Sequence, residues 1–358
     1  MRKNNNLSKL IEKCIELPLL PYKGKILAKH IWRRLEKSEL NWDPWILKDG
    51  EIYRLFYLRG ANRSIRRPWW KIESKIYGAI STNLKNWEDI GVILEPDPAN
   101  SWESGRLMAG STYKEDGIYY LFYSASGKDF MNEAIGLATS IDGLHWQRSS
   151  TAPLLKPDDQ NYWYENSYHF QWRDPYIVRE DRTGKYYMFV TASSKDHGGC
   201  IGLAVADKIS GPYELLPPVT APSVEGTSES IYYEMERPQV IYKAGKYHLF
   251  FSAFLSTLNS KWIHKVGRDK LSDSTLYWYV ADSLSSSFKP ISNKPIVEGS
   301  EHTGIYGTNF LQTSDKPDEF IAYGWRHRLF SLELSAMYQV VWGPNKIEIT
   351  RRINNKPK

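Results

Sequence analysis

Apolar and aromatic positions recur along this chain with a long and regular spacing. A turn residue is followed by a strand-like segment that carries an aromatic residue near its start and further aromatic residues after it. Five segments show this pattern: Gly50–Tyr57, Gly117–Tyr123, Gly184–Val190, Gly245–Phe251 and, in a more degenerate form, Glu319–Trp325. Their period of roughly 60 to 75 residues predicts one supersecondary unit for each copy.

Each copy is followed by further strand signals. A second apolar segment comes next in the five units: Ile76–Ile80, Ile135–Thr139, Ile201–Val205, Tyr277–Val280 and, less clearly, Ser331–Leu334. A polar turn and then an outer aromatic residue follow in four of them: Trp87, Trp146, Tyr213 and Phe288. Together with a segment ahead of each copy, these signals predict a four-stranded antiparallel unit.

The five units have apolar faces that none of them can bury alone. Stacking the units around an axis buries these faces and leaves only short strand edges. We therefore expect an all-β fold, a five-bladed β-propeller with four-stranded blades over residues 41–358. A pair of β-sandwiches is the alternative, although sandwiches do not require a fivefold period. Residues 1–40 have helical apolar spacing, as at Leu7, Leu10 and Ile11, which predicts a short helical extension outside the blades.

Composition narrows the classes of partner. The 358 residues include 14 Trp, 24 Tyr and 12 Phe, which suits both strands and surfaces that stack on sugars. A net charge of +6 is mild, so we expect neither nucleic acid nor a membrane as partner. Lys and Glu interrupt the apolar residues of the N-terminal segment, which favours a cytoplasmic location and leaves non-classical export open. No cofactor and no metal are expected, and the oligomeric state is not readable.

Carboxylates stand at a similar place in three of the units. Asp43 precedes Tyr53 by 10 residues, Asp174 precedes Tyr186 by 12, and Glu236 precedes Tyr247 by 11. We expect these places to be equivalent and to converge at the axial funnel. Any single Asp-Pro or Arg-Pro could be an ordinary turn, but three converging carboxylates repel one another, which is costly unless function retains them.

Such a set of carboxylates suits the cleavage of a glycosidic bond. One carboxylate attacks the anomeric carbon, a second protonates the leaving oxygen, and a third steadies the positive charge of the transition state. Arg173 and Arg237 would orient carboxylates or hydroxyls, and Trp42 would offer an apolar face to a furanose ring. The expected partner is therefore a small sugar or an oligosaccharide.

Three motifs resemble the levansucrase and invertase group of glycoside hydrolases, over about residues 40–350. Trp172-Arg173-Asp174-Pro175 is similar to the Arg-Asp-Pro motif of that group, and Trp42-Asp43 with Trp45 is similar to its nucleophile motif. Glu234-Met235-Glu236-Arg237 resembles its Glu-x-Glu-Arg motif. The resemblance implies a five-bladed propeller acting on fructofuranosides such as sucrose, with Asp43 as nucleophile, Asp174 as transition-state stabiliser and Glu236 as general acid.

The resemblance also implies a set of substrate-binding residues: Trp42, Trp102, Ser104, Arg173, Glu234, Arg237 and Tyr306. Trp102 and Ser104 resemble a Trp-Ser-Gly segment, and Tyr306 resembles a tyrosine that supports the blade of the acid. The chain departs from the levansucrase pattern by placing Glu103 between Trp102 and Ser104 and by lacking an obvious arginine directly after the segment Tyr247–Phe251. The donor, the acceptor and the product therefore stay open.

Three functions remain at this point. The first is a retaining fructosidase or fructosyltransferase, with the two reacting carboxyls about 5 to 5.5 Å apart. The second is an inverting pentofuranosidase of the arabinan-cleaving type, in which the gap widens to about 6.5 to 9.5 Å. The third is a propeller that binds sugars without cleaving them.

Overall fold

The computed structural model describes residues 39–61, 72–163, 170–196, 198–271, 275–292, 294–296, 305–314, 316, 318–328, 331–344 and 346–352. The predicted helical extension lies outside these residues, apart from its last positions. There the first strand, β1, begins at Glu39, slightly ahead of the expected domain boundary.

Blades one to three are four-stranded antiparallel meanders. Blade one contains β1 (Glu39–Asp49), β2 (Ile52–Ala61), β3 (Lys75–Ser81) and β4 (Glu88–Leu94). Blade two contains β5 (Arg106–Glu115), β6 (Ile118–Ser126), β7 (Ala134–Ser140) and β8 (Gln147–Arg148), with a short 3-10 turn, η2 (Ser101–Glu103), ahead of it. Blade three contains β9 (Trp172–Arg179), β10 (Tyr186–Ser193), β11 (Gly199–Ala206) and β12 (Glu214–Thr220).

Blades four and five complete the fold. Blade four contains β13 (Glu236–Lys243), β14 (Lys246–Ala253), β15 (Thr275–Ala281) and β16 (Lys289–Pro290). The long connection from β14 to β15 carries η3 (Leu255–Thr257), α3 (Ser260–Val266) and η4 (Arg268–Lys270). Blade five contains β17 (Tyr306–Gln312), β18 (Phe320–Arg328), β19 (Ser331–Leu334), β20 (Tyr338–Trp342) and β21 (Ile347–Arg352).

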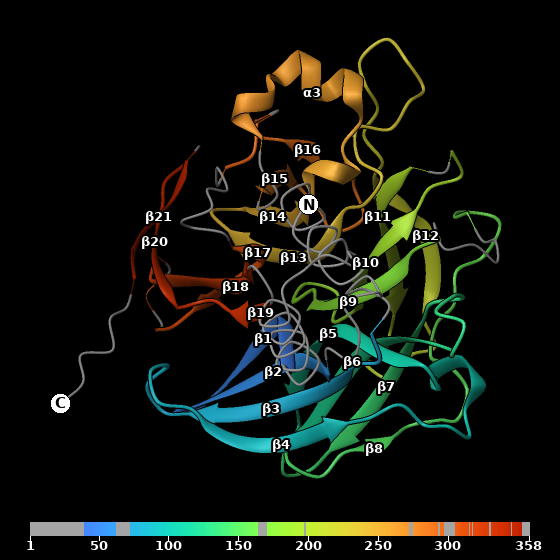
Figure 1. Cartoon of the computed structure of the whole chain (residues 1–358), viewed down its shortest axis with the longest axis vertical. Coiled ribbons are helices and arrows are strands. Elements are labelled where there is room, and N and C mark those ends of the chain that lie inside the picture. The colour runs from blue at the N-terminus through green and yellow to red at the C-terminus, as the bar shows by residue number, and fades with distance from the viewer. Residues whose placement is uncertain are drawn as a thin grey trace, which may run out of the picture.

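The five sheets are arranged around a common centre, with β1, β5, β9, β13 and β17 innermost (Figure 1). Blade one packs against blade five through β1, β18 and β19, which closes the ring. Buried residues fill the gaps between neighbouring blades. Phe189 and Leu249 pack in one cluster between blades three and four, and Phe250 and Phe310 pack in another between blades four and five. The predicted five-bladed propeller is confirmed.

The outer aromatic residues mark the blade edges as expected. Trp87, Trp146, Tyr213 and Phe288 each stand directly before the outermost strand of a blade. Phe288 is buried and meets Phe189 of blade three edge-on, so this residue helps to join blade four to its neighbour.

Two details correct the expected all-β, strictly four-stranded pattern. The first is the helix α3. The side chain of Asn259, the residue before the helix, accepts a hydrogen bond from the Lys261 N–H, and Trp262 of the helix is buried in the core of blades three and four. Blade five has five strands, because β19 pairs with the end of β18 while β20 pairs with its start. Two short strands thus share the place that one strand takes in the other blades. No helix within the described ranges is long and apolar enough to cross a membrane.

Candidate active site

A β-bulge that contains a left-handed residue recurs on the innermost strands of four blades; the bulge of β5, between Met108 and Gly110, contains none. The register shifts between Trp42 and Trp45 in β1, and at the corresponding points of β9, β13 and β17. One residue in each bulge has a left-handed backbone: Asp43 (φ 45°), Asp174 (φ 58°), Arg237 (φ 58°) and Gly307 (φ 57°). This conformation is uncommon for residues other than glycine and gathers at functional sites, where a bulge re-aims a side chain.

The bulges show which positions are equivalent between blades. Asp43 and Asp174 occupy the same place, and a proline follows each of them. In blade four that place is held by Arg237, so Glu236 stands one residue earlier. The expectation that all three carboxylates share one position is therefore wrong for Glu236. Its counterpart in blade five is Tyr306, which opposes β18 just ahead of the bulge.

Asp43 stands on β1 of blade one, beside Arg237 of blade four and Gly307 of blade five. Its side chain is 18% exposed, and its Oδ1 lies 4.0 Å from Nε of Arg237. A Cβ placed at Gly307 would lie 3.2 Å from Asp43 Oδ1 and 3.2 Å from Trp325 Nε1, so this glycine makes room for the carboxylate. Burial raises the pKa of Asp43 to about 7; Arg237 and a hydrogen bond from Trp325 act in the opposite direction.

Asp174 is held more tightly. Its Oδ2 accepts hydrogen bonds from Thr191 Oγ1 and from the backbone N–H of Arg237, both at 3.1 Å. Its own N–H donates to Ser124 Oγ of blade two at 3.1 Å. Burial raises the pKa of the Asp174 carboxyl, while Arg237 and Arg173 lower it. Contacts from blades three and four thus fix the side chain, and a contact from blade two fixes the backbone.

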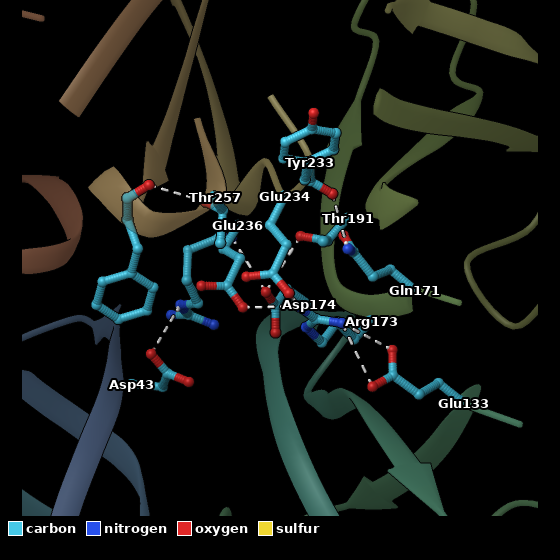
Figure 2. A network of polar contacts seen from close by, with 12 residues as sticks. Asp43, Glu133, Gln171, Arg173, Asp174, Thr191, Tyr233, Glu234, Glu236 and Thr257 are labelled. Carbon is cyan, nitrogen blue, oxygen red and sulfur yellow. Dashed lines mark hydrogen bonds and ion pairs between the residues drawn. The ribbon is translucent and has the colours of Figure 1, made fainter. Parts of the chain in front are cut away.

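Arg173 joins several carboxylates (Figure 2). Its Nη2 donates to Glu236 Oε1 at 2.8 Å and lies 3.7 Å from Glu234 Oε1. Its Nη1 donates to Glu133 Oε2 at 3.1 Å on the other side. Glu236 also accepts a hydrogen bond on Oε2 from the Tyr306 hydroxyl at 2.5 Å. Both oxygens of Glu236 are therefore held by fixed donors.

Glu234 lies beside Glu236 and is less enclosed, since 31% of its side chain is exposed. Burial raises the pKa of Glu234 to about 7, and the nearby charge of Glu236 raises it further, against the opposing effect of Arg173. With Asp43, the site therefore contains two carboxyls that titrate near neutral pH.

Comparison with known proteins finds sequence similarity to glycoside hydrolases. The family model described as the glycosyl hydrolases family 32 N-terminal domain matches residues 43–208, and so begins at Asp43. A levansucrase from Rahnella aquatilis is 24% identical over 211 residues, which cover 55% of this chain and 42% of that protein. The chain is therefore similar in sequence to the levansucrase- and invertase-like group of glycoside hydrolases. It spans less than half the length of the curated relatives that it matches.

Solved structures share the propeller of this group. An inulosucrase from Halalkalicoccus jeotgali bound to kestose superimposes with a TM-score of 0.67 at 19% identity, covering 89% of this chain and 88% of that chain. The Bacillus subtilis levansucrase superimposes with a TM-score of 0.67 at 16% identity, covering 97% and 94%. At these identities the likeness establishes the fold alone.

Arg237 is buried and acts across blades. Its Nη2 donates to the Pro44 carbonyl at 3.0 Å, and its Nη1 donates to the Gly110 carbonyl at 3.4 Å. Its guanidinium lies 5.8 Å from the centre of the Trp45 ring. These contacts tie blade four to blades one and two, so Arg237 orients the carboxylates from within the protein.

Three of the predicted sugar-binding residues make contacts away from the carboxylates. Trp42 is 5% exposed and packs in the core beneath Gly60, which leaves little of its ring accessible. Trp102 stacks on Tyr123 of its own blade and donates from Nε1 to the Thr151 carbonyl at 3.0 Å. Ser104 donates to the carbonyl at the start of its own turn. Their binding of substrate stays a prediction.

Glu103, the departure from the levansucrase pattern, has a structural place. It is fully buried and accepts hydrogen bonds from Arg148 Nε at 2.8 Å and from the Tyr123 hydroxyl at 2.9 Å. The insertion therefore puts a charged pair inside blade two.

Two residues of the site, Glu133 and its partner Arg106, were not revealed by the sequence. Glu133 stands in the loop before β7, outside the repeated strand pattern, and only the fold brings it to Arg173. The assembled site contains five carboxylates and three arginines: Asp43, Glu133, Asp174, Glu234, Glu236, Arg106, Arg173 and Arg237. This excess of negative charge stabilises a positively charged transition state, and it also favours the retention of a proton on one of the carboxyl groups.

Proposed function

We propose that this protein is a retaining fructosidase or fructosyltransferase that acts on a β-fructofuranoside such as sucrose. The observation that carries the proposal is the pairing of Asp43 and Asp174 in the same bulge of two inner strands, with Glu236 held beside them by Arg173 and Tyr306. These are the carboxylates that a double displacement requires.

In the first step, an oxygen of ionised Asp43 attacks the anomeric carbon of the fructosyl unit. A bond forms between them as the bond to the leaving oxygen breaks, and Glu236 gives its proton to that oxygen. Asp174 cannot turn, since its Oδ2 is held by Thr191 and by the backbone of Arg237. Its negative charge therefore stays close to the positive charge that develops on the sugar ring.

In the second step, Glu236 takes a proton from a water molecule or a sugar hydroxyl, which attacks the anomeric carbon and releases Asp43. The Tyr306 hydroxyl is suited to both steps, because a hydroxyl can donate to an ionised carboxylate or accept from a protonated one. Water yields hydrolysis and a sugar hydroxyl yields transfer.

The test is a panel of donors followed by chromatography and by NMR of the first-formed product. Sucrose, kestose and arabinofuranosides serve as donors; kestose is included because the related inulosucrase was solved with it. We expect fructose or a fructosylated product formed with retention, and loss of turnover in Asp43→Asn. Asp49→Asn is the matched control, since Asp49 ends the same strand and pairs with Arg54 and Lys114 there.

Other results would point to the alternative functions. Cleavage of an arabinofuranoside with inversion would replace the proposal by an inverting pentofuranosidase. Binding of sugars without turnover of any donor would indicate a propeller that recognises glycans and does not cleave them.

A further inference from the structure

Glu133 crosses from blade two to blade three. Its side chain is 6% exposed, and its Oε2 accepts a hydrogen bond from the backbone N–H of Trp172 at 2.9 Å. The same oxygen accepts from Arg173 Nη1 at 3.1 Å. One carboxylate oxygen therefore holds both the backbone and the side chain at the start of β9.

Arg106 holds Glu133 from its own blade. Its Nη2 donates to Glu133 Oε1 at 3.3 Å, and its Nε donates to Ser126 Oγ at 3.1 Å. Its guanidinium also lies 5.4 Å from the centre of the Phe130 ring. The carboxylate is thus fixed on both oxygens before it meets Arg173.

Arg173 transmits this position to Glu236. A guanidinium is planar and rigid, so a contact that fixes one edge also fixes the direction of the other edge. Nη1 faces Glu133 and Nη2 faces Glu236, as Figure 2 shows. Without Glu133, the cations Arg106 and Arg173 would face each other with no carboxylate between them, and Arg173 would be drawn toward Glu234 and Glu236 alone.

We propose that Glu133 is a positioning residue for the general acid: it fixes Arg173 so that Glu236 points at the leaving oxygen. The inference rests on the function proposed above, in which Glu236 donates that proton. Misplacement of a reacting group by about 1 Å costs about 100-fold in rate, so the expected loss on weakening this contact is about 10- to 100-fold in kcat.

The test compares two donors. Sucrose has a sugar leaving group that must be protonated, whereas p-nitrophenyl β-fructofuranoside has one that departs with little help. In Glu133→Gln we expect kcat with sucrose to fall by about 10- to 100-fold. The pre-steady-state rate of nitrophenolate release, which reports the first step alone, should fall by less than about threefold. KM should change little for either donor, because Glu133 is separated from the sugar by Arg173.

Glu115→Gln is the matched control. Glu115 ends β5, the strand that Arg106 begins, and likewise crosses to blade three, where it accepts a hydrogen bond from the Tyr186 hydroxyl at 2.6 Å. Its removal should lower stability and leave unchanged the ratio of kcat with sucrose to the rate of nitrophenolate release. If Glu133→Gln does not fold, Glu133→Asp retains the charge with a shorter reach and should shift the ratio in the same direction.

An equal loss with both donors in Glu133→Gln, or an unchanged rate with sucrose, overturns the inference. A shift of the ratio in Glu115→Gln as large as that in Glu133→Gln overturns it as well. Asp43→Asn is run in the same assay: if that variant still turns over both donors, the proposed function itself fails, whatever Glu133 does.

Discussion

Asp43→Asn should make the protein more stable at neutral pH while it abolishes turnover. Burial raises the pKa of Asp43 to about 7, whereas the unfolded chain ionises this group near 3.8. Between these values the folded protein keeps a proton that the unfolded chain has released. The stabilising contribution of this carboxyl is therefore complete below pH 3.8 and is lost as the pH rises through 7.

The size of the effect follows from the shift. A change from 3.8 to about 7 corresponds to a ceiling of about 4 kcal/mol in the free energy of unfolding. Asparagine also loses the attraction between the carboxylate and Arg237, whose Nε lies 4.0 Å away. We therefore expect a net gain of about 1 to 3 kcal/mol at about pH 8, and almost none at about pH 4.

The assay is urea unfolding followed by tryptophan fluorescence, from about pH 4 to about pH 8. Asp49→Asn should show the opposite sign: burial raises the pKa of Asp49, but hydrogen bonds from Lys114, Tyr119 and Arg54 outweigh it and lower the pKa to about 2. That variant should be less stable than the parent at neutral pH, and the difference should shrink as the pH falls below about 4. The reasoning would be refuted by an Asp43→Asn protein that is less stable than the parent at pH 8. A difference in the free energy of unfolding that does not change with pH would refute it as well.

Three further variants test neighbouring parts of the account. Tyr306→Phe removes the hydroxyl that holds Glu236 and should lower kcat by about tenfold or more in steady-state assays, since a hydrogen bond to a charged group contributes about 1.5 to 3 kcal/mol. Gly307→Ala places a methyl 3.2 Å from Asp43 Oδ1 on a left-handed backbone and should cost about 1 to 2 kcal/mol of stability in urea unfolding, together with activity. Burial lowers the pKa of His248, so stability should fall as the pH drops below about 6.5, and His248→Gln should flatten that slope in thermal unfolding.

The fivefold repeat of the propeller could be predicted from the sequence because every blade packs against its neighbours in the same way. Each blade buries both faces against its neighbours, so aromatic and apolar residues return at the same points of each unit. The aromatic residue before each outer strand is one such point, as Trp146 before β8 illustrates. The helix α3 and the strand β20 break this rule locally, and no repeated signal marks them; the segment of β19 was among the repeated signals, although a less clear one.

The alignment of the carboxylates could not be read by counting back from the tyrosines. The turn between the two inner strands is longer in blade three, where Arg179 pairs with Tyr186, than in blades one and four. The distances of 10, 12 and 11 residues therefore gave the wrong equivalence for Glu236. The prolines would have been the better guide. Pro44, Pro175 and Pro238 follow the left-handed residue in blades one, three and four, and aligning them places Arg237 opposite Asp43 and Asp174.

Glu133 could not be found from the sequence for a different reason. It lies in a loop that belongs to no repeat, and its partners Trp172 and Arg173 are about 40 residues away in the chain. Only the side-by-side placement of blades two and three brings the three residues together. Sites built between blades therefore need the fold before their supporting residues can be named.

The central claim is that a fructosyl unit becomes covalently attached to Asp43. The most direct test is intact-mass and peptide-mass spectrometry of Glu236→Gln after brief incubation with p-nitrophenyl β-fructofuranoside. In this variant the first step still proceeds, but no base activates the second. The account predicts a mass increase of one hexosyl unit on the peptide that contains Asp43. Release of nitrophenolate in step with free sugar of inverted configuration, and no labelled peptide, would contradict it.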